Sequence, residues 1–136
     1  MLLESKFFQP RPRQDIVVRP RLLAQLNTGL QRKLILVLAQ AGFGKTTLVA
    51  HWLNTLTQVP AADPAHQETL ARPLSVWLSL DENDNDPLRF FDYLITALQR
   101  ADSSVGQHAR YLLSAPQPPT SLEPLAISLF NDLTNL

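Results

Sequence analysis

The residues with the clearest chemical potential form a short loop that carries two glycines. The loop reads Ala39-Gln40-Ala41-Gly42-Phe43-Gly44-Lys45-Thr46-Thr47. It fits the Walker A pattern of a small residue, four free positions and then Gly-Lys-Ser/Thr. Glycine tolerates positive φ and lets the backbone approach a phosphate closely, and successive amide N–H groups then form a cradle for anions. We therefore predict that this loop binds the phosphates of a nucleotide.

Lys45, Thr46 and the helix that follows the loop have separate expected roles in that binding. The Lys45 ammonium should reach the outer phosphates, and the Thr46 hydroxyl should ligate a Mg²⁺ ion that bridges them. The helix that starts near Lys45 adds the partial positive charge of its N-terminus. The predicted phosphate-binding residues are Ala41, Gly42, Phe43, Gly44, Lys45, Thr46 and Thr47, with Thr46 as the metal ligand.

The loop needs a strand before it and a helix after it. Residues 34–39 are six apolar residues in a row, which predicts a strand buried on both faces, as in parallel sheets. Residues 46–56 carry apolar residues at helical spacing, which predicts a helix with one buried side. This order favours a phosphate-binding loop over a glycine-rich turn with an exposed lysine.

The rest of the chain alternates between helical and extended patterns. We expect an extended segment at 1–20, a short helix at 21–30, a surface loop at 58–73 and a second strand at 74–80. Asp86-Pro87 is a helix start with Asp as N-cap and Pro in the first turn, and that helix should run to about Arg100. A shorter helix is expected near 103–113, and Ser121 should cap a last helix.

Composition narrows the class of protein. The 136 residues are 45% hydrophobic and 18% charged, which is typical of one globular domain. The chain has no cysteine, so disulfides and zinc fingers are excluded and a cytoplasmic location is expected. The net charge is zero, but residues 1–45 hold eight of the twelve Lys/Arg, which suits a polyphosphate ligand. No apolar run approaches the ~20 residues that span a bilayer, so no membrane partner is expected.

Three stretches resemble a known family in the same order along the chain. They are Val18-Arg-Pro-Arg-Leu-Leu23, Leu38-Ala-Gln-Ala-Gly-Phe-Gly-Lys-Thr-Thr-Leu48, and Val76-Trp-Leu-Ser-Leu-Asp-Glu-Asn-Asp-Asn-Asp-Pro87 with its continuation to Ile95. Together they resemble the N-terminal nucleotide-binding domain of MalT-like, LuxR-type bacterial transcriptional regulators, which are signal-transducing P-loop ATPases. The resemblance implies a three-layer α/β/α fold of the P-loop NTPase class with a parallel sheet. Residues 21–136 would form a partial domain, truncated before the acidic Walker B strand.

The resemblance also implies a function. Such proteins are thought to switch between ADP and ATP states, with Mg²⁺, and to self-associate in the ATP state. DNA would be contacted only through a C-terminal helix-turn-helix module absent from this chain. Arg19 and Arg21 resemble a segment that packs beside the nucleotide base and are therefore added to the predicted binding residues. The alternative is a proline-led helix start with solvated arginines.

Hydrolysis is not expected from this chain alone, because no hydrophobic strand ending in Asp-Asp is present, and we predict no catalytic residue. Asp81 follows the second strand, but helix capping is the better interpretation of this acidic turn. Two strands without partners should also fold poorly alone.

Two other classes of protein stay open: a different P-loop ATPase or kinase, and an interaction module that binds no nucleotide. Trp52 and Trp77 are expected in the core, and His51, His66 and His108 at the surface.

Overall fold

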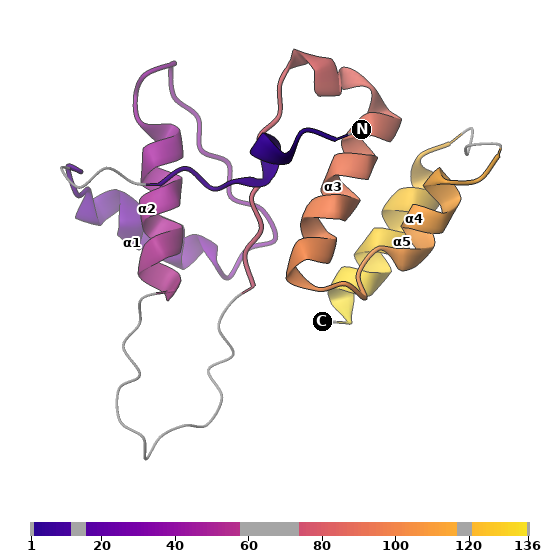
Figure 1. The fold of residues 1–136 in the computed structure, drawn as a ribbon. Coiled ribbons are helices and arrows are strands. Elements are labelled where there is room, and N and C mark those ends of the chain that lie inside the picture. The colour runs from indigo at the N-terminus through magenta and orange to yellow at the C-terminus, as the bar shows by residue number, and fades with distance from the viewer. Residues whose placement is uncertain (1, 12–15, 58–73, 117–120, 136) are drawn as a thin grey trace. The chain divides into compact units, whose positions relative to one another are not determined.

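The computed structural model describes residues 2–11, 16–57, 74–116 and 121–135 (Figure 1). The predicted surface loop at 58–73 therefore lies outside the described residues. The chain divides into two compact units. We call Met1–Gln9 with Leu74–Leu136 the helical unit, and Pro10–Pro73 the loop unit.

The predicted parallel-sheet α/β fold is wrong for this structure, because the described residues contain helices and no β-strand. The two predicted strands, 34–39 and 74–80, have no regular secondary structure. In the first of them Leu34, Leu36 and Leu38 are 78%, 72% and 80% exposed. An apolar run becomes a sheet strand only when neighbouring strands accept its backbone hydrogen bonds and cover its faces. Neither condition is met among the described residues.

Three helices build the core of the helical unit. They are α3 (Pro87–Ala101), α4 (Gln107–Leu113) and α5 (Glu123–Thr134), and α4 and α5 lie side by side in Figure 1. Their shared core is formed by Ile95, Ala109, Leu125 and Leu129. The predicted helices in this region are confirmed, although α4 begins four residues later than expected. The predicted cap is present in part, since the Ser121 hydroxyl accepts the Glu123 N–H at 3.2 Å while Leu122 is the N-cap.

The start of α3 confirms the Asp-Pro prediction. The Asp86 carboxylate accepts the N–H groups of Leu88 at 2.9 Å and Arg89 at 3.1 Å. These bonds satisfy donors that no intrahelical carbonyl can reach. The acidic turn before α3 is a 3₁₀ helix, η3 (Glu82–Asn85), which Asp81 caps in turn.

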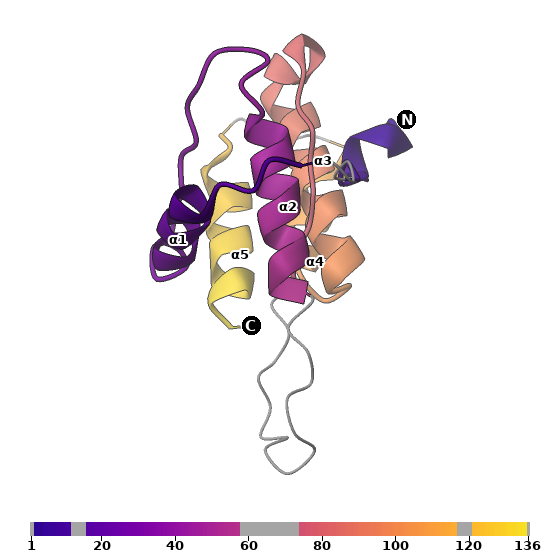
Figure 2. The same cartoon turned by 90° about the vertical axis from the view of Figure 1, so that its left-hand side faces the viewer.

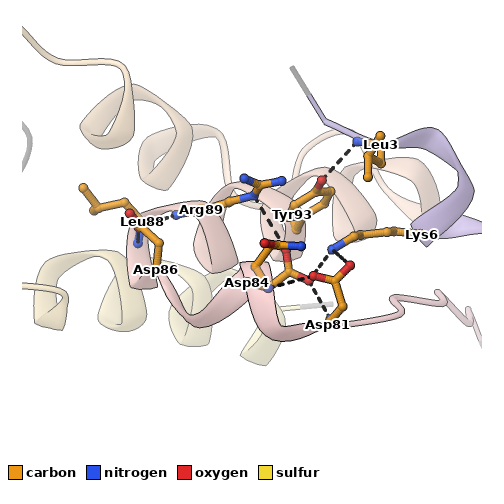
Figure 3. A network of polar contacts seen from close by, with 9 residues as sticks. Leu3, Lys6, Asp81, Asp84, Asp86, Leu88, Arg89 and Tyr93 are labelled. Carbon is orange, nitrogen blue, oxygen red and sulfur yellow. Dashed lines mark hydrogen bonds and ion pairs between the residues drawn. The ribbon is translucent and has the colours of Figure 1, made fainter.

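The N-terminal segment is attached to α3 and η3 by a polar network (Figure 3). A 3₁₀ turn, η1 (Glu4–Phe7), presents Lys6, which is 5% exposed, to the carboxylates of Asp84 and Asp81. The Leu3 N–H donates to the Tyr93 hydroxyl at 3.0 Å. The hydrogen bonds from Lys6 lower the pKa of both carboxyl groups. Burial opposes the charge of Lys6, but its bonds to the two carboxylates outweigh this and raise its pKa.

The loop unit contains two helices, α1 (Pro20–Gly29) and α2 (Lys45–Thr57), which contact each other. Both are drawn in purple tones in Figure 1 and, from the side, in Figure 2. Both predicted helices are confirmed. Trp52 of α2 is 7% exposed, and its indole N–H donates to the Asn27 side-chain oxygen of α1 at 2.7 Å. The prediction that Trp52 belongs to the core is therefore correct, and this bond connects the two helices. No helix among the described residues is long and apolar enough to cross a membrane.

Candidate functional site

The glycine loop before α2 has the backbone conformation that its sequence requires. Gly42 and Gly44 adopt φ of 82° and 77°, values in the left-handed region that side chains disfavour. A Cβ atom built on either glycine would meet nothing within 4 Å. The Phe43 N–H donates to the Gln40 carbonyl at 3.4 Å, which closes the turn. The loop is therefore open on the side where a glycine allows close approach.

The first turn of α2 offers hydrogen-bond donors next to this loop. The Leu48 N–H donates to the Gly44 carbonyl at 2.9 Å, so Gly44 accepts the first bond of the helix. The N–H groups of Lys45, Thr46 and Thr47 precede that bond and have no intrahelical acceptor. Unpaired N–H groups and the helix dipole make such a terminus favourable for an anion.

Lys45 adds a positive charge to the same loop. Its ammonium donates to the carbonyls of Ala39 at 2.6 Å and Gln40 at 2.8 Å. These two bonds hold the charge against the loop backbone. A lysine ammonium has three donors, so one further bond can be made to a ligand without breaking either of the two.

A pocket of about 350 Å³ adjoins the loop within the same unit. The segment before α1 forms one side of it and α2 the other. Its volume lies within the usual range for small-molecule sites. The lining residues are Ile16, Val17, Arg19, Gly44, Thr47, Leu48 and His51.

The structure places the predicted residues in three groups. Gly44, Thr47 and Arg19 line the pocket together. Ala41, Gly42, Phe43, Lys45 and Thr46 lie in the loop or at the start of α2 without lining the pocket. Arg21 is exposed on α1 and is not among the lining residues, so the structure separates it from Arg19.

His51 was missed by sequence reasoning, which placed it at the surface. The structure shows it half-buried in the pocket wall, one turn after Thr47. A signal for it exists in the sequence. Residues 44, 47, 48 and 51 follow the spacing of one helix face, so they lie on the same side of the helix.

The residues present fit a nucleotide phosphate better than a protein-bound metal. The described residues contain no group of three or more His, Cys, Asp or Glu side chains that could hold a metal ion. Mg²⁺ commonly binds through one or two protein oxygens together with ligand phosphates. The exposed Thr46 hydroxyl at the start of α2 could supply such an oxygen. Asp81 is engaged with Lys6 and with the Asn83 N–H, which supports its interpretation as a cap.

Comparison with known proteins points to one group of regulators. The chain is 40% identical over 137 aligned residues to the HTH-type transcriptional regulator MalT of Serratia proteamaculans (strain 568). The chain is MalT-like along nearly its whole length. MalT of Yersinia pestis (strain Pestoides F) is 39% identical, and MalT of Cronobacter sakazakii (strain ATCC BAA-894) is 36% identical. The alignments cover 98–99% of this chain but only 13% of each regulator. No family model matches the chain.

Proposed function

We propose that this chain is the ATP/ADP-binding part of a signal-responsive transcriptional regulator. The observation that carries the proposal is the loop at 39–47, in which two left-handed glycines lie open beside the N-terminus of α2. The regulatory role is supported by the similarity to proteins named as HTH-type transcriptional regulators.

The residues of the loop have separate tasks in this proposal. The amides of the loop and of the first turn of α2 bind the phosphates, and the Lys45 ammonium bonds to an outer phosphate. The Thr46 hydroxyl holds Mg²⁺ together with the phosphate oxygens. When bound, ATP supplies a γ-phosphate that ADP lacks, so a site that contacts this group can distinguish the two states.

The remaining steps of regulation involve parts of the protein outside this chain. The chain spans 13% of the length of the MalT regulators it matches. We propose that DNA binding belongs to a helix-turn-helix module elsewhere in the full protein, and that the ATP state favours self-association in the cytoplasm. The chain itself contributes the nucleotide site and no catalytic residue.

Calorimetric titration of ATP and ADP, each with Mg²⁺, tests the proposal on the intact chain. Lys45→Ala should weaken binding about 10- to 100-fold, because charge-assisted hydrogen bonds contribute ~1.5–3 kcal/mol. Lys33→Ala is the matched control, since Lys33 is an exposed lysine outside the loop and should change affinity less than about twofold. Failure of the wild-type chain to bind either nucleotide, or equal affinities for wild type and Lys45→Ala, would overturn the proposal. The first of these results would favour an interaction module.

A further inference from the structure

A second cavity belongs to the helical unit and shares no lining residue with the pocket beside the glycine loop. It has a volume of about 390 Å³ and is lined by the N-terminal segment, α3 and α4. We propose that this cavity binds a small carboxylate that carries an apolar chain. The proposal does not depend on nucleotide binding, because all the lining residues belong to the helical unit.

The apolar part of the lining is held in place by the protein core. Leu2, Leu88 and Leu113 line the cavity from the N-terminal segment, α3 and α4, and each is half-buried. Leu88 and Leu113 pack against the shared core of the three helices, and Leu2 packs against the cluster of Phe7 and Tyr93. The leucines are therefore positioned before a ligand arrives, and they offer apolar surface from three elements.

Arg110 of α4 is a cation of the lining that is fixed against α3. Its guanidinium donates to the Asp92 carboxylate, to the Thr96 hydroxyl at 2.6 Å and to the Gln99 side-chain oxygen at 3.2 Å. Asp92 also lines the cavity, and its ion pair with Arg110 balances the two charges. The positive charge in excess within the lining is therefore that of Arg89.

Arg89 has donors to offer a ligand. Its Nε atom lies 3.7 Å from the buried Asp84 Oδ1, to which no hydrogen bond is made among the described residues (Figure 3). Its guanidinium also contacts the Tyr93 side chain. A guanidinium has five N–H donors, so these two neighbours leave donors for a ligand. The side chain is 43% exposed, so a ligand can reach it.

The balance of charge in the lining selects the kind of ligand. Two guanidinium groups and one carboxylate line the cavity, so a single negative charge makes the lining neutral. A carboxylate supplies that charge and matches a guanidinium with two parallel hydrogen bonds. The three leucines suit an apolar chain beside it, and the cavity volume lies within the usual range for small-molecule sites.

A titration with three probes separates the roles of charge and chain. We would add octanoate, acetate and octylammonium to the isotope-labelled intact chain and follow the amide chemical shifts. Octanoate should bind at least about tenfold more tightly than acetate, which lacks the chain. It should also bind at least about tenfold more tightly than octylammonium, which carries the opposite charge. The largest shifts should fall in the N-terminal segment, α3 and α4.

Paired variants test the lining residues. Arg89→Gln should weaken octanoate binding about five- to tenfold, whereas Arg32→Gln, at an exposed arginine of the loop unit, should bind as wild type does. Leu2→Ala should weaken it about two- to fivefold by removing part of the apolar wall. Leu3→Ala is the control, because Leu3 is 55% exposed, does not line the cavity and bonds to Tyr93 through its backbone. Far-UV circular dichroism verifies that each variant keeps its helices.

Several results would overturn the proposal. They are an absence of octanoate binding, equal affinities for octanoate and octylammonium, and unchanged octanoate affinity in Arg89→Gln. Shifts centred on the exposed apolar face of α5 around Phe130 would place the ligand on another surface and would also overturn it. If Arg89→Gln loses its helices, the three probes on wild type decide the question. None of these results changes the outcome of the nucleotide titration.

Discussion

The two units of the chain differ in how their backbone groups are hydrogen-bonded and in how far their apolar side chains are buried. In the helical unit, Ile95 and Leu125 are fully buried and every helix satisfies most of its own backbone. In the loop unit, the segment 34–39 has no regular secondary structure and leaves three leucines more than 70% exposed. The comparison teaches that a helix supports itself through local bonds, whereas an extended segment depends on partners. The largest fully buried side chains, Tyr93, Ile95 and Leu125, all belong to the helical unit, whereas the candidate binding site lies in the loop unit.

Truncating one leucine in each unit should give the largest difference in unfolding free energy between the two units. Leu125→Ala should lower the free energy of unfolding by about 2–5 kcal/mol, because it leaves a cavity among α3, α4 and α5. Leu38→Ala should change it by less than about 0.5 kcal/mol, because Leu38 is 80% exposed. Urea unfolding followed by far-UV circular dichroism measures both values. Comparable losses in the two variants would mean that Leu38 is buried in solution.

The next largest effect on stability is expected from the Lys6 network, and this effect depends on pH. The pKa values of Asp81 and Asp84 are lowered in the folded state, chiefly by their hydrogen bonds to Lys6. A lowered carboxyl pKa stabilises the fold above the ordinary value of 3.8, and this contribution is lost as the pH falls through the lowered values. Lys6→Met should therefore reduce the Tm clearly at pH 7 and much less near pH 2.

Thermal melts of wild type and Lys6→Met across this pH range measure that difference. Lys33→Met removes an exposed lysine in the loop unit and should leave the Tm and its pH dependence nearly unchanged. If the difference between wild type and Lys6→Met stays constant from pH 7 to pH 2, the carboxylates are not the partners that matter.

Two glycines with nearly the same backbone angle give the smallest and most selective comparison. Gly106 and Gly44 have φ of 72° and 77°, so alanine at either position introduces similar strain of about 1–2 kcal/mol. A Cβ at Gly106 would lie 3.1 Å from Ile95 and Leu129, whereas at Gly44 it would meet nothing within 4 Å. Gly106→Ala should therefore destabilise the chain by about 1 kcal/mol more than Gly44→Ala. Equal losses in urea unfolding would show that the core around Gly106 is loosely packed.

The helices could be predicted from the sequence because their signals are local. Asp86 and Pro87 define the start of α3 through bonds that reach only two or three residues ahead. The two predicted strands were wrong, because an apolar run such as 34–39 indicates burial but does not specify which segment would pair with it and cover it. The Lys6–Asp84 pair was also beyond sequence reasoning, since its partners are 78 positions apart.

The candidate site, like the fold, could be predicted where its signals are local and not where they depend on tertiary structure. The glycines of the loop follow from the backbone angles that a phosphate cradle requires, and their positive φ values are confirmed. Binding of nucleotide by these residues stays a prediction. His51 was missed because the pocket forms only when the segment before α1 lies against α2. That arrangement is tertiary, and the helical spacing of residues 44–51 alone does not reveal what faces it.

The attachment of the N-terminal segment also sets an order of events during synthesis. Lys6 leaves the ribosome before its partner exists, because Asp84 is translated 78 residues later. At about 5–20 residues per second, this delay is roughly 4–16 s. During that time Phe7 of η1 cannot pack against Tyr93 and remains available to chaperones. The segment around Lys6 is thus made well before the carboxylates that fix it in the folded unit.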